Sequence, residues 1–171
     1  RATHPMSTHS KIILFAEIPE VIRKEKEMGN KIVQCHGTFD LIHPGHVIHF
    51  EESKGMGDVL IVTVTGEQFV NKGPGRPYFN DELRLKSLTA LESVDYVAII
   101  PYPAAVEAIE AVNPDVYCKG KEYEIAQDDV TGNMTDDVKT VKAVGGKIRY
   151  VGSVIFSSTK LLHGNFSTQS P

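Results

Sequence analysis

The sequence predicts an α/β domain with a doubly wound, mainly parallel sheet of five strands and helices on both faces. Short apolar runs alternate with longer segments of helical periodicity, and glycine, asparagine or proline residues end most of the helical segments. Each strand is therefore followed by a helix and then by another strand. This order is typical of parallel sheets, whose ligands bind beyond the carboxyl ends of the strands.

The elements are expected in strict alternation along the central part of the chain. Strands are expected at residues 31–35, 59–64, 96–100, 116–118 and 147–151, and helices at residues 17–28, 44–54, 81–91, 103–112 and 136–144. Residues 66–80, rich in Gly and Pro, and residues 121–135, rich in acidic and polar side chains, do not fit this rhythm. Both are expected to be loops, and long loops inside a domain usually serve as lids or binding loops.

Length and composition favour one soluble domain. The chain has 171 residues, of which 41% are hydrophobic, enough for one core but not for two ordinary domains. A net charge of -4 provides no general attraction for nucleic acid, and no apolar run approaches the roughly 20 residues that span a membrane. The two cysteines, Cys35 and Cys118, are expected to be buried thiols, in line with a cytoplasmic protein.

The domain is expected to occupy residues 11–164. Residues 1–10 lack a periodic pattern and are expected to be disordered, with Arg1 to Pro5 added ahead of a natural start at Met6. Residues 165–171 are polar and are expected to form a tail or the beginning of a linker.

A polar motif follows the first expected strand directly. Gly37-Thr38-Phe39-Asp40 leaves the sheet, and His43-Pro44-Gly45-His46 opens the next helix. Proline suits the first turn of a helix because its missing N–H would have no partner there in any case. His43 and His46 are three residues apart, so both point to one side, beside free backbone N–H groups and the positive end of the helix dipole. The motif predicts a triphosphate site.

A metal site is the alternative for this motif, because His43, His46 and His49 recur at every third position. We favour the phosphate site, since Gly45 and residues 37–40 have no purpose in a zinc site. His49 by itself is expected to be a core or surface histidine.

Two separated motifs resemble those of a known enzyme family. Residues 37–46 resemble the first signature of the cytidylyltransferase-like (H-x-G-H) nucleotidyltransferases, and Phe156-Ser157-Ser158-Thr159-Lys160-Leu161-Leu162 resembles their second, S-[ST]-T-x-[IL]. Residues 72–77, Arg84 and residues 114–120 are similar to the heptose 1-phosphate adenylyltransferase domain. Glycerol-3-phosphate cytidylyltransferases are also similar, but they carry an arginine where this chain has Gly152, and these families often have an aspartate where it reads Thr65-Gly66-Glu67.

The resemblance implies a reaction. A phosphate oxygen of a phosphorylated sugar or polyol attacks the α-phosphate of ATP or CTP and releases pyrophosphate. That oxygen is already ionised, so catalysis depends on positioning and charge stabilisation rather than on a strong base. Mg²⁺ is the implied cofactor, held mostly by phosphate and water.

The resemblance also implies roles for residues. His43 and His46 are expected to donate hydrogen bonds to the α-phosphate and the bridging oxygen, with Lys72 as the third catalytic residue. Lys119 is expected to neutralise phosphate, and Arg84 either to do the same or to fix the loop. For Asp40 a catalytic role and a role as a turn or capping residue fit the sequence equally well, and we assign it to binding. The expected nucleotide-binding residues are Gly37, Thr38, Phe39, Asp40, Gly45, Arg84 and Lys119, with Ser157, Ser158 and Thr159 for the β- and γ-phosphates.

Partners and rival functions also follow from the resemblance. The family is commonly dimeric, which implies a homodimer, and heptose-activating enzymes are often fused to a sugar kinase. We therefore expect either a fused or associated kinase, or an ordinary frayed end at residues 167–171. The rivals are a cytidylyltransferase for a polyol phosphate or a phosphonate, an adenylyltransferase of coenzyme synthesis, and a non-catalytic nucleotide-binding relative.

Overall fold

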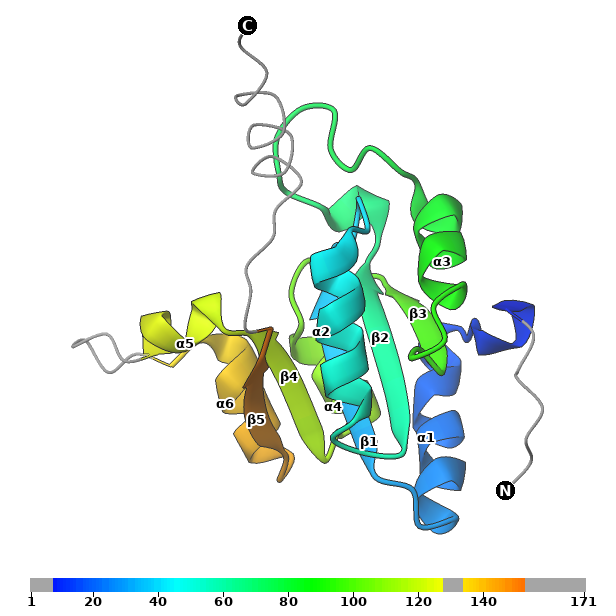
Figure 1. Ribbon diagram of the computed structural model, residues 1–171, viewed down its shortest axis with the longest axis vertical. Helices are drawn as coiled ribbons and strands as arrows, with labels where there is room; N and C mark the ends of the chain where they lie inside the picture. The colour runs from blue at the N-terminus through cyan, green and yellow to red at the C-terminus, as the bar shows by residue number, and fades with distance from the viewer. Residues whose placement is uncertain (1–7, 128–133, 153–171) are drawn as a thin grey trace, which may run out of the picture.

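A computed structural model describes residues 8–127 and 134–152 and confirms the predicted fold class. Five strands form one sheet in the order β3-β2-β1-β4-β5, and each neighbouring pair is parallel. Figure 1 shows the sheet with its strands running side by side. The strands are β1 (Ile32–Gly37), β2 (Val59–Thr65), β3 (Tyr96–Ile100), β4 (Val116–Gly120) and β5 (Lys147–Val151).

Helices and short turns connect the strands. The α-helices are α1 (Ile18–Glu27), α2 (Pro44–Lys54), α3 (Asp81–Thr89), α4 (Val106–Val112), α5 (Glu122–Gln127) and α6 (Asp136–Ala143). Three 3-10 turns are η1 (Thr8–Lys11), η2 (Phe15–Glu17) and η3 (Glu67–Phe69). In the part of the chain that the structure describes, no helix is both long and apolar enough to cross a membrane.

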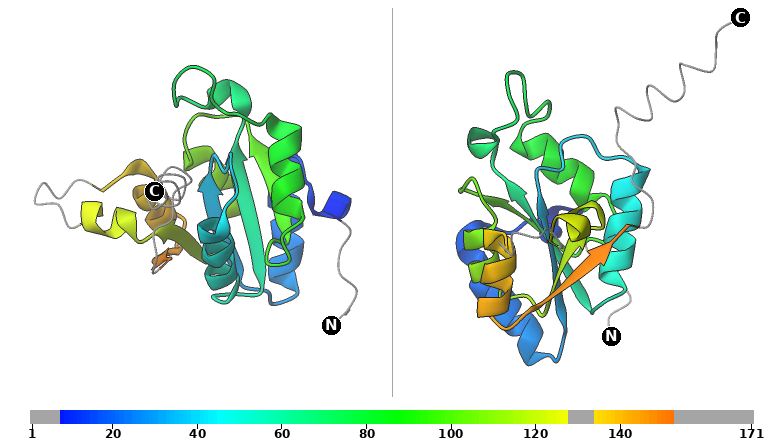
Figure 2. Two further views of the ribbon diagram at one scale, coloured as in Figure 1. Left: turned by 45° about the horizontal axis from the view of Figure 1, so that its top comes forward. Right: turned by 90° about the vertical axis from the view of Figure 1, so that its left-hand side faces the viewer.

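The helices cover both faces of the sheet. Phe50 of α2 and Leu88 of α3 share one core cluster, whereas Ile22 of α1 and Ala108 of α4 belong to a second. Val141 of α6 packs beside α4 in a third cluster. The right-hand view of Figure 2 shows α2, in cyan, on one side of the sheet and α6, in yellow to orange, on the other.

Strand β2 shows why the central strands have an unbroken series of apolar residues in the sequence. Every residue of β2 is buried. Leu60 and Val62 pack in the cluster under α2 and α3, while Val59 and Ile61 pack in the cluster under α1 and α4. Because both faces of a parallel sheet are covered by helices, its central strands need apolar side chains at successive positions.

Capping residues explain where several helices begin and end. The side chain of Asn80 accepts a hydrogen bond of 2.9 Å from the backbone N–H of Leu83 at the start of α3. Helix α4 ends at Asn113, whose φ of 50° lies in the left-handed region, and Pro114 follows. Asparagine tolerates this conformation and proline cannot continue a helix, so the predicted end of α4 is confirmed.

Several details differ from the prediction. Residues 121–135 were expected to be a loop, but α5 occupies Glu122–Gln127. A helix of this length is too short to show periodicity, although Glu122 and Glu124 suit the positive end of its dipole. Helix α4 begins at Val106 rather than at residue 103. The turn η1 includes residues 8–10, which were assigned to the disordered N-terminus.

Candidate active site

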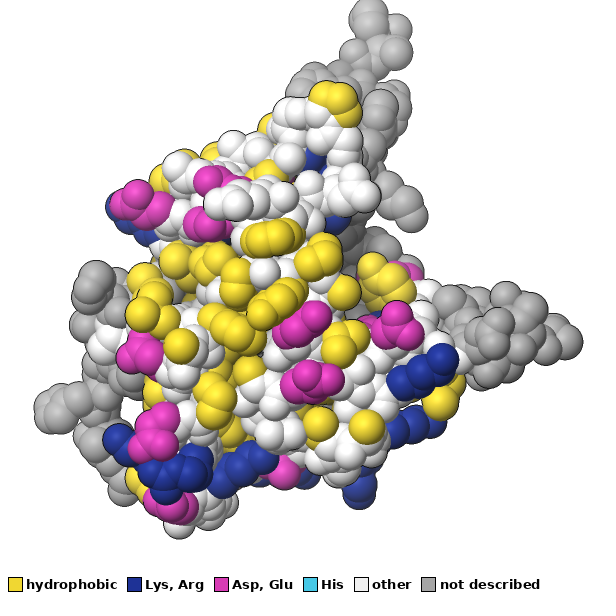
Figure 3. Space-filling model, turned by 180° about the vertical axis from the view of Figure 1, so that it is seen from behind, with side chains coloured by type: hydrophobic (Ala, Val, Ile, Leu, Met, Phe, Trp, Pro, Cys, Tyr) yellow, Lys and Arg dark blue, Asp and Glu magenta, His cyan; other side chains and the backbone are white. Residues whose placement is uncertain are grey.

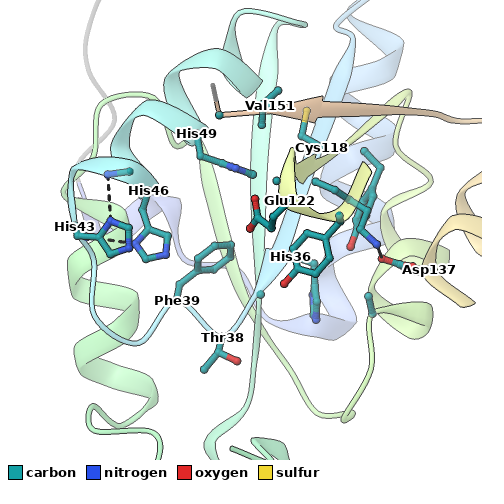
Figure 4. Close-up of a pocket in the computed structure, with 18 of the residues that line it drawn as sticks. His36, Thr38, Phe39, His43, His46, His49, Cys118, Glu122, Asp137 and Val151 are labelled. Carbon is teal, nitrogen blue, oxygen red and sulfur yellow. Dashed lines mark hydrogen bonds and ion pairs between the residues drawn. The ribbon is translucent and has the colours of Figure 1, made fainter. Parts of the chain in front are cut away.

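A pocket of about 470 Å³ opens at the carboxyl ends of β1 and β4. In the strand order β3-β2-β1-β4-β5 the connections reverse direction between β1 and β4, and doubly wound sheets bind ligands at this point. Figure 4 shows the side chains that line the pocket, with the imidazoles of His43 and His46 at one end and Asp137 at the other. The lining residues include Gly37, Thr38, Phe39, His43, Gly45, His46, His49, Lys72, Lys119 and Glu122.

The histidine end of the pocket consists of His43, His46 and Lys72. His43 is the N-cap of α2, and its Nδ1 accepts a hydrogen bond of 3.1 Å from the backbone N–H of Gly45. Nδ1 of His46 accepts one of 3.2 Å from the backbone N–H of His43. The two side chains thus cap the first turn of the helix, a role usually taken by Ser, Thr, Asp or Asn. Their ring centroids are 3.9 Å apart.

These hydrogen bonds determine the tautomer of both histidines. An Nδ1 that accepts a hydrogen bond carries no proton, so a neutral ring keeps its proton on Nε2. Burial, with help from the neighbouring His43, His49 and Lys72, lowers the pKa of His46 to about 4, and burial also lowers the pKa of His43. At neutral pH both rings are therefore neutral, and neither Nε2–H has a hydrogen-bond partner among the described residues.

The turn after β1 brings its backbone close to an aromatic ring. A Cβ atom at Gly37 would lie 2.9 Å from the ring of Phe39, closer than carbon atoms pack, so any other residue there would push the ring aside. Phe39 itself has a φ of 47°, in the left-handed region that non-glycine residues rarely adopt. Its ring packs edge-on against His46 and Phe50, with centroids 5.8 and 5.1 Å apart. This packing compensates for the strained backbone beside the site.

Asp40 lies beneath the pocket wall rather than in the pocket. It is buried, and its carboxylate accepts hydrogen bonds from the backbone N–H groups of Tyr78 (2.7 Å) and Phe79 (2.9 Å). It also pairs with Arg76 at 3.4 Å. Asp40 therefore anchors residues 66–80, the loop that carries Lys72. Of the two roles that the sequence allowed, the geometry supports the structural one.

Arg84, which the sequence assigns either to nucleotide binding or to fixing the loop, is surrounded by protein groups. Its side chain is fully buried and donates to the backbone oxygens of Thr38 (2.9 Å) and Thr65 (2.7 Å), and it pairs with Asp81 at 2.6 Å. All of these partners are protein groups, and the residue does not line the pocket. Arg84 instead ties the end of β2 to the turn after β1, which is the alternative role of fixing the loop.

The ion-pair end of the pocket consists of His36, Tyr117, Lys119 and Asp137. Nζ of Lys119 donates to Oδ2 of Asp137 at 2.7 Å, and both side chains are largely buried, with 11% and 19% exposed. Burial opposes ionisation of Asp137, but hydrogen bonds from Lys119 and Thr135 outweigh it and lower the pKa of Asp137. The pair is therefore charged at neutral pH.

His36 belongs to a network of hydroxyl groups at the same end. Its Nδ1 lies 2.9 Å from Oγ1 of Thr63, and its Nε2 lies 3.3 Å from Oγ1 of Thr65. Oγ1 of Thr63 also accepts from Gln34 and donates to the backbone oxygen of Cys35, so it can only accept from His36. Burial lowers the pKa of His36 to about 4. His36 is therefore neutral, with its proton on Nδ1.

The pocket brings together most of the predicted site residues and several that the sequence did not reveal. His36, Tyr117, Asp137 and Glu122 were missed, although His36 stands directly before the recognised motif. His49, expected to be a core or surface histidine, lines the pocket. Cys35 and Cys118 are buried free thiols as predicted, and Cys118 also lines the pocket. Ser157, Ser158 and Thr159 lie outside the described residues.

The opposite side of the molecule differs in character. Seen from behind, the described surface has hydrophobic side chains gathered near its centre and charged side chains around them, and no histidine of the described residues is visible (Figure 3). The site histidines thus open toward the side with the strand ends and α2.

Comparisons with known proteins agree with this geometry. The family described as cytidylyltransferase-like matches residues 34–164. The bifunctional protein HldE of Aliarcobacter butzleri is 40% identical over 146 residues, which are 84% of this chain and 30% of that protein. The bifunctional protein HldE of Methylococcus capsulatus is 38% identical over 149 residues, 86% of this chain and 30% of that protein. The chain therefore spans about a third of the length of these relatives.

Two solved structures share the fold. The lipopolysaccharide core biosynthesis protein from Thermoplasma volcanium has a TM-score of 0.57 at 23% identity and covers 74% of this chain and 100% of its own. Pantoate-beta-alanine ligase from Francisella tularensis has a TM-score of 0.60 at 15% identity, covering 90% of this chain and 76% of its own. At these identities the likeness concerns the fold alone. The family match, which extends over most of the chain and includes the histidine motif, shows that this chain belongs to the cytidylyltransferase-like family of nucleotidyltransferases.

Proposed function

We propose that this chain transfers AMP from ATP to a phosphorylated sugar and releases pyrophosphate. The observation that carries the proposal is the pair of neutral imidazoles at the start of α2, in each of which Nδ1 accepts a hydrogen bond while Nε2–H has no partner in the part of the chain that the structure describes. Such donors are suited to a phosphoryl group on which negative charge increases during reaction.

The proposed step is a displacement at the α-phosphorus. An ionised phosphate oxygen of the acceptor forms the new bond to phosphorus, while the bond to the oxygen that bridges to the β-phosphate breaks, and that oxygen leaves with pyrophosphate. His43 and His46 donate to the α-phosphate and to the bridging oxygen, and Lys72 offsets charge beside them. No side chain has to remove a proton, which is consistent with the low pKa of His46.

The choice of a sugar phosphate and of ATP follows from the resemblance of residues 72–77 and 114–120 to heptose 1-phosphate adenylyltransferases. The matches to bifunctional HldE proteins support the same choice. They also support a second activity beside this domain, and we assign it to a sugar kinase that supplies the phosphorylated acceptor. A shared polypeptide would raise the local concentration of that intermediate. The complete coding sequence tests this assignment.

Mg²⁺ enters the proposal as the counter-ion of the triphosphate. Among the described residues no cluster of three or more His, Cys, Asp or Glu side chains could hold a metal ion. The oxygens of Asp137 already accept from Lys119, Thr135 and Val138. The described residues thus fit an ion held by phosphate oxygens and water, which would neutralise the triphosphate.

A pyrophosphate-release screen tests the function. ATP and CTP are each combined with heptose, glycerol, erythritol and ribitol phosphates, with and without Mg²⁺. The expected result is release with ATP and a heptose phosphate. Release with CTP and a polyol phosphate would instead identify a cytidylyltransferase, and binding of triphosphate without turnover on any acceptor would contradict catalysis.

A further inference from the structure

The two ends of the pocket lie on opposite faces of the sheet. Successive side chains of a strand point to opposite faces. Cys118 of β4 packs with Cys35 in the cluster under α2, whereas Tyr117 packs with Ile109 and Val141 under α4 and α6. Lys119 therefore stands on the same face as Tyr117, away from α2. A ligand that occupies the whole pocket has to cross the strand ends from one face to the other.

Lys119 is held in one place by neighbours from two helices. Asp137 of α6 binds its ammonium group at 2.7 Å, and the ring of Tyr123 of α5 lies 5.1 Å from the same nitrogen. The second oxygen of Asp137 accepts from Oγ1 of Thr135 and, at 2.9 Å, from the backbone N–H of Val138. Asp137 is thus itself fixed, and it determines where the ammonium group of Lys119 lies.

Within the ion pair of this end the charges of Lys119 and Asp137 balance. The positive charge of Lys119 is matched by Asp137, and His36 is neutral. Burial raises the pKa of Tyr117, so its phenol is neutral as well. Glu122 adds a further carboxyl group to the lining. Such an end is poorly suited to a phosphate dianion, which prefers uncompensated cations and free backbone N–H groups.

The histidine end has the complementary properties. Lys72 is exposed and has no ion-pair partner within 4 Å among the described residues, and the first turn of α2 supplies the positive end of a helix dipole. The phosphates of both substrates are therefore expected there. The rest of the acceptor can then extend across the strand ends to the ion-pair end, where Lys119 and Asp137 offset each other's charge.

We propose that the ion-pair end binds the uncharged, hydroxyl-bearing part of the acceptor, with Lys119 and Asp137 as specificity-determining residues. This inference rests on the proposed function and gives Lys119 a different role from the phosphate neutralisation expected from the sequence. The ammonium group of Lys119 has three N–H groups and donates one of them to Asp137, so others are left for a hydroxyl oxygen. His36 and Tyr117 line the same end of the pocket. Asp137 is the positioning residue, since it holds the lysine. A site built to hydrogen-bond hydroxyl groups discriminates strongly against ligands that lack them.

The test compares Asp137→Asn with Asp136→Asn, its exposed neighbour in the first turn of the same helix. Both changes remove one negative charge from α6, but only the first disturbs Lys119. For Asp137→Asn we expect the KM for heptose 1-phosphate to rise about tenfold, equivalent to about 1.4 kcal/mol. The KM for ATP and the kcat should change less than about twofold, and Asp136→Asn should resemble the wild type in all three.

A second variant and a second ligand separate hydroxyl recognition from phosphate binding. Lys119→Met should weaken binding of heptose 1-phosphate, measured by calorimetry in the presence of a non-hydrolysable ATP analogue, by about tenfold or more. Binding of methyl phosphate, which has no hydroxyl group, should be unchanged. Equal losses for both ligands, or a raised KM for ATP, would show that Lys119 binds phosphate and would overturn the inference.

The outcomes also separate this inference from the proposed function. If the wild-type chain releases no pyrophosphate with any acceptor, the proposed function fails and the inference fails with it. If the wild type is active and Asp137→Asn behaves like Asp136→Asn, only the inference fails. If Asp137→Asn unfolds at a lower urea concentration and loses affinity for both substrates equally, Asp137 has a structural role alone, which also contradicts the inference.

Discussion

The two ends of the pocket are held in place by different means. At the histidine end, the hydrogen bonds that orient His43 and His46 lie within one turn of α2 and involve neighbouring residues. At the ion-pair end, Lys119 of β4 and Asp137 of α6 are 18 residues apart and meet only because the two elements pack together. The first arrangement depends on a helix start, whereas the second depends on the tertiary fold. Changes to the protein should therefore affect the two ends separately.

The largest expected effect is at the histidine end. His46→Ala should lower kcat by roughly two to three orders of magnitude and change the affinity for ATP much less, because its donor acts mainly in the transition state. Single-turnover kinetics and equilibrium binding of an ATP analogue measure the two quantities. Unchanged turnover would show that His46 takes no part in the reaction. The proposed difference between a catalytic histidine end and a binding ion-pair end would then lose its main support.

The second effect concerns Arg84, whose hydrogen bonds hold the turn after β1 in place. Arg84→Met removes the buried donor to Thr38 and Thr65 and leaves both carbonyl oxygens without it. The free energy of unfolding should fall by about 3 kcal/mol in urea denaturation. Arg23→Met is the matched control, since Arg23 forms only exposed ion pairs with Glu20 and Glu27, and it should cost less than about 1 kcal/mol. Similar losses for the two variants would contradict the role given to Arg84.

An acidic pH should lower the free energy of unfolding through one histidine at each end of the pocket. Folding lowers the pKa of His36 and of His46 from 6.5 to about 4, so between these values the unfolded chain binds more protons than the native one. The stability that depends on these histidines being neutral is complete above pH 6.5 and is lost as the pH falls toward 4, by about 3 kcal/mol for His36 and by less for the more exposed His46. Urea denaturation at several pH values between 7 and 4.5 measures the loss. His36→Asn should make the profile flatter, and a profile as steep as that of the wild type would show that His36 is not responsible.

The smallest effect is expected from Thr135→Ala. Oγ1 of Thr135 donates to the carboxylate of Asp137, so its removal loosens the ion-pair end without touching α2. The free energy of unfolding should fall by about 1 kcal/mol or less. The affinity for ATP should stay the same and that for heptose 1-phosphate should fall slightly, both by calorimetry. A loss of ATP affinity would show that the two ends are coupled.

The histidine end could be predicted because the residues that form it are close together in the sequence. Gly37, Pro44 and the spacing of His43 and His46 act through the local backbone, and the structure places all of them as expected. The roles of Asp40 and Arg84 could not be assigned in the same way. Both carry charges that suit phosphate as well as protein partners, and only their burial beneath the loop of residues 66–80 and the strand ends distinguishes the two uses.

The alternation of strands and helices, the position of each strand within a few residues and the motif at the start of α2 could all be predicted from the amino-acid sequence. These features depend on periodicity, capping and turn chemistry, which act between near neighbours in the chain. One end of the pocket brings together His36, Tyr117, Lys119 and Asp137, and this grouping became visible only in the folded chain. Their meeting depends on the strand order, in which β1 lies beside β4, and on the packing of α6 against α4. The burial of apolar side chains drives the packing of these elements, and this force is not directional. The sequence around each polar residue therefore does not predict which other polar residues will lie beside it.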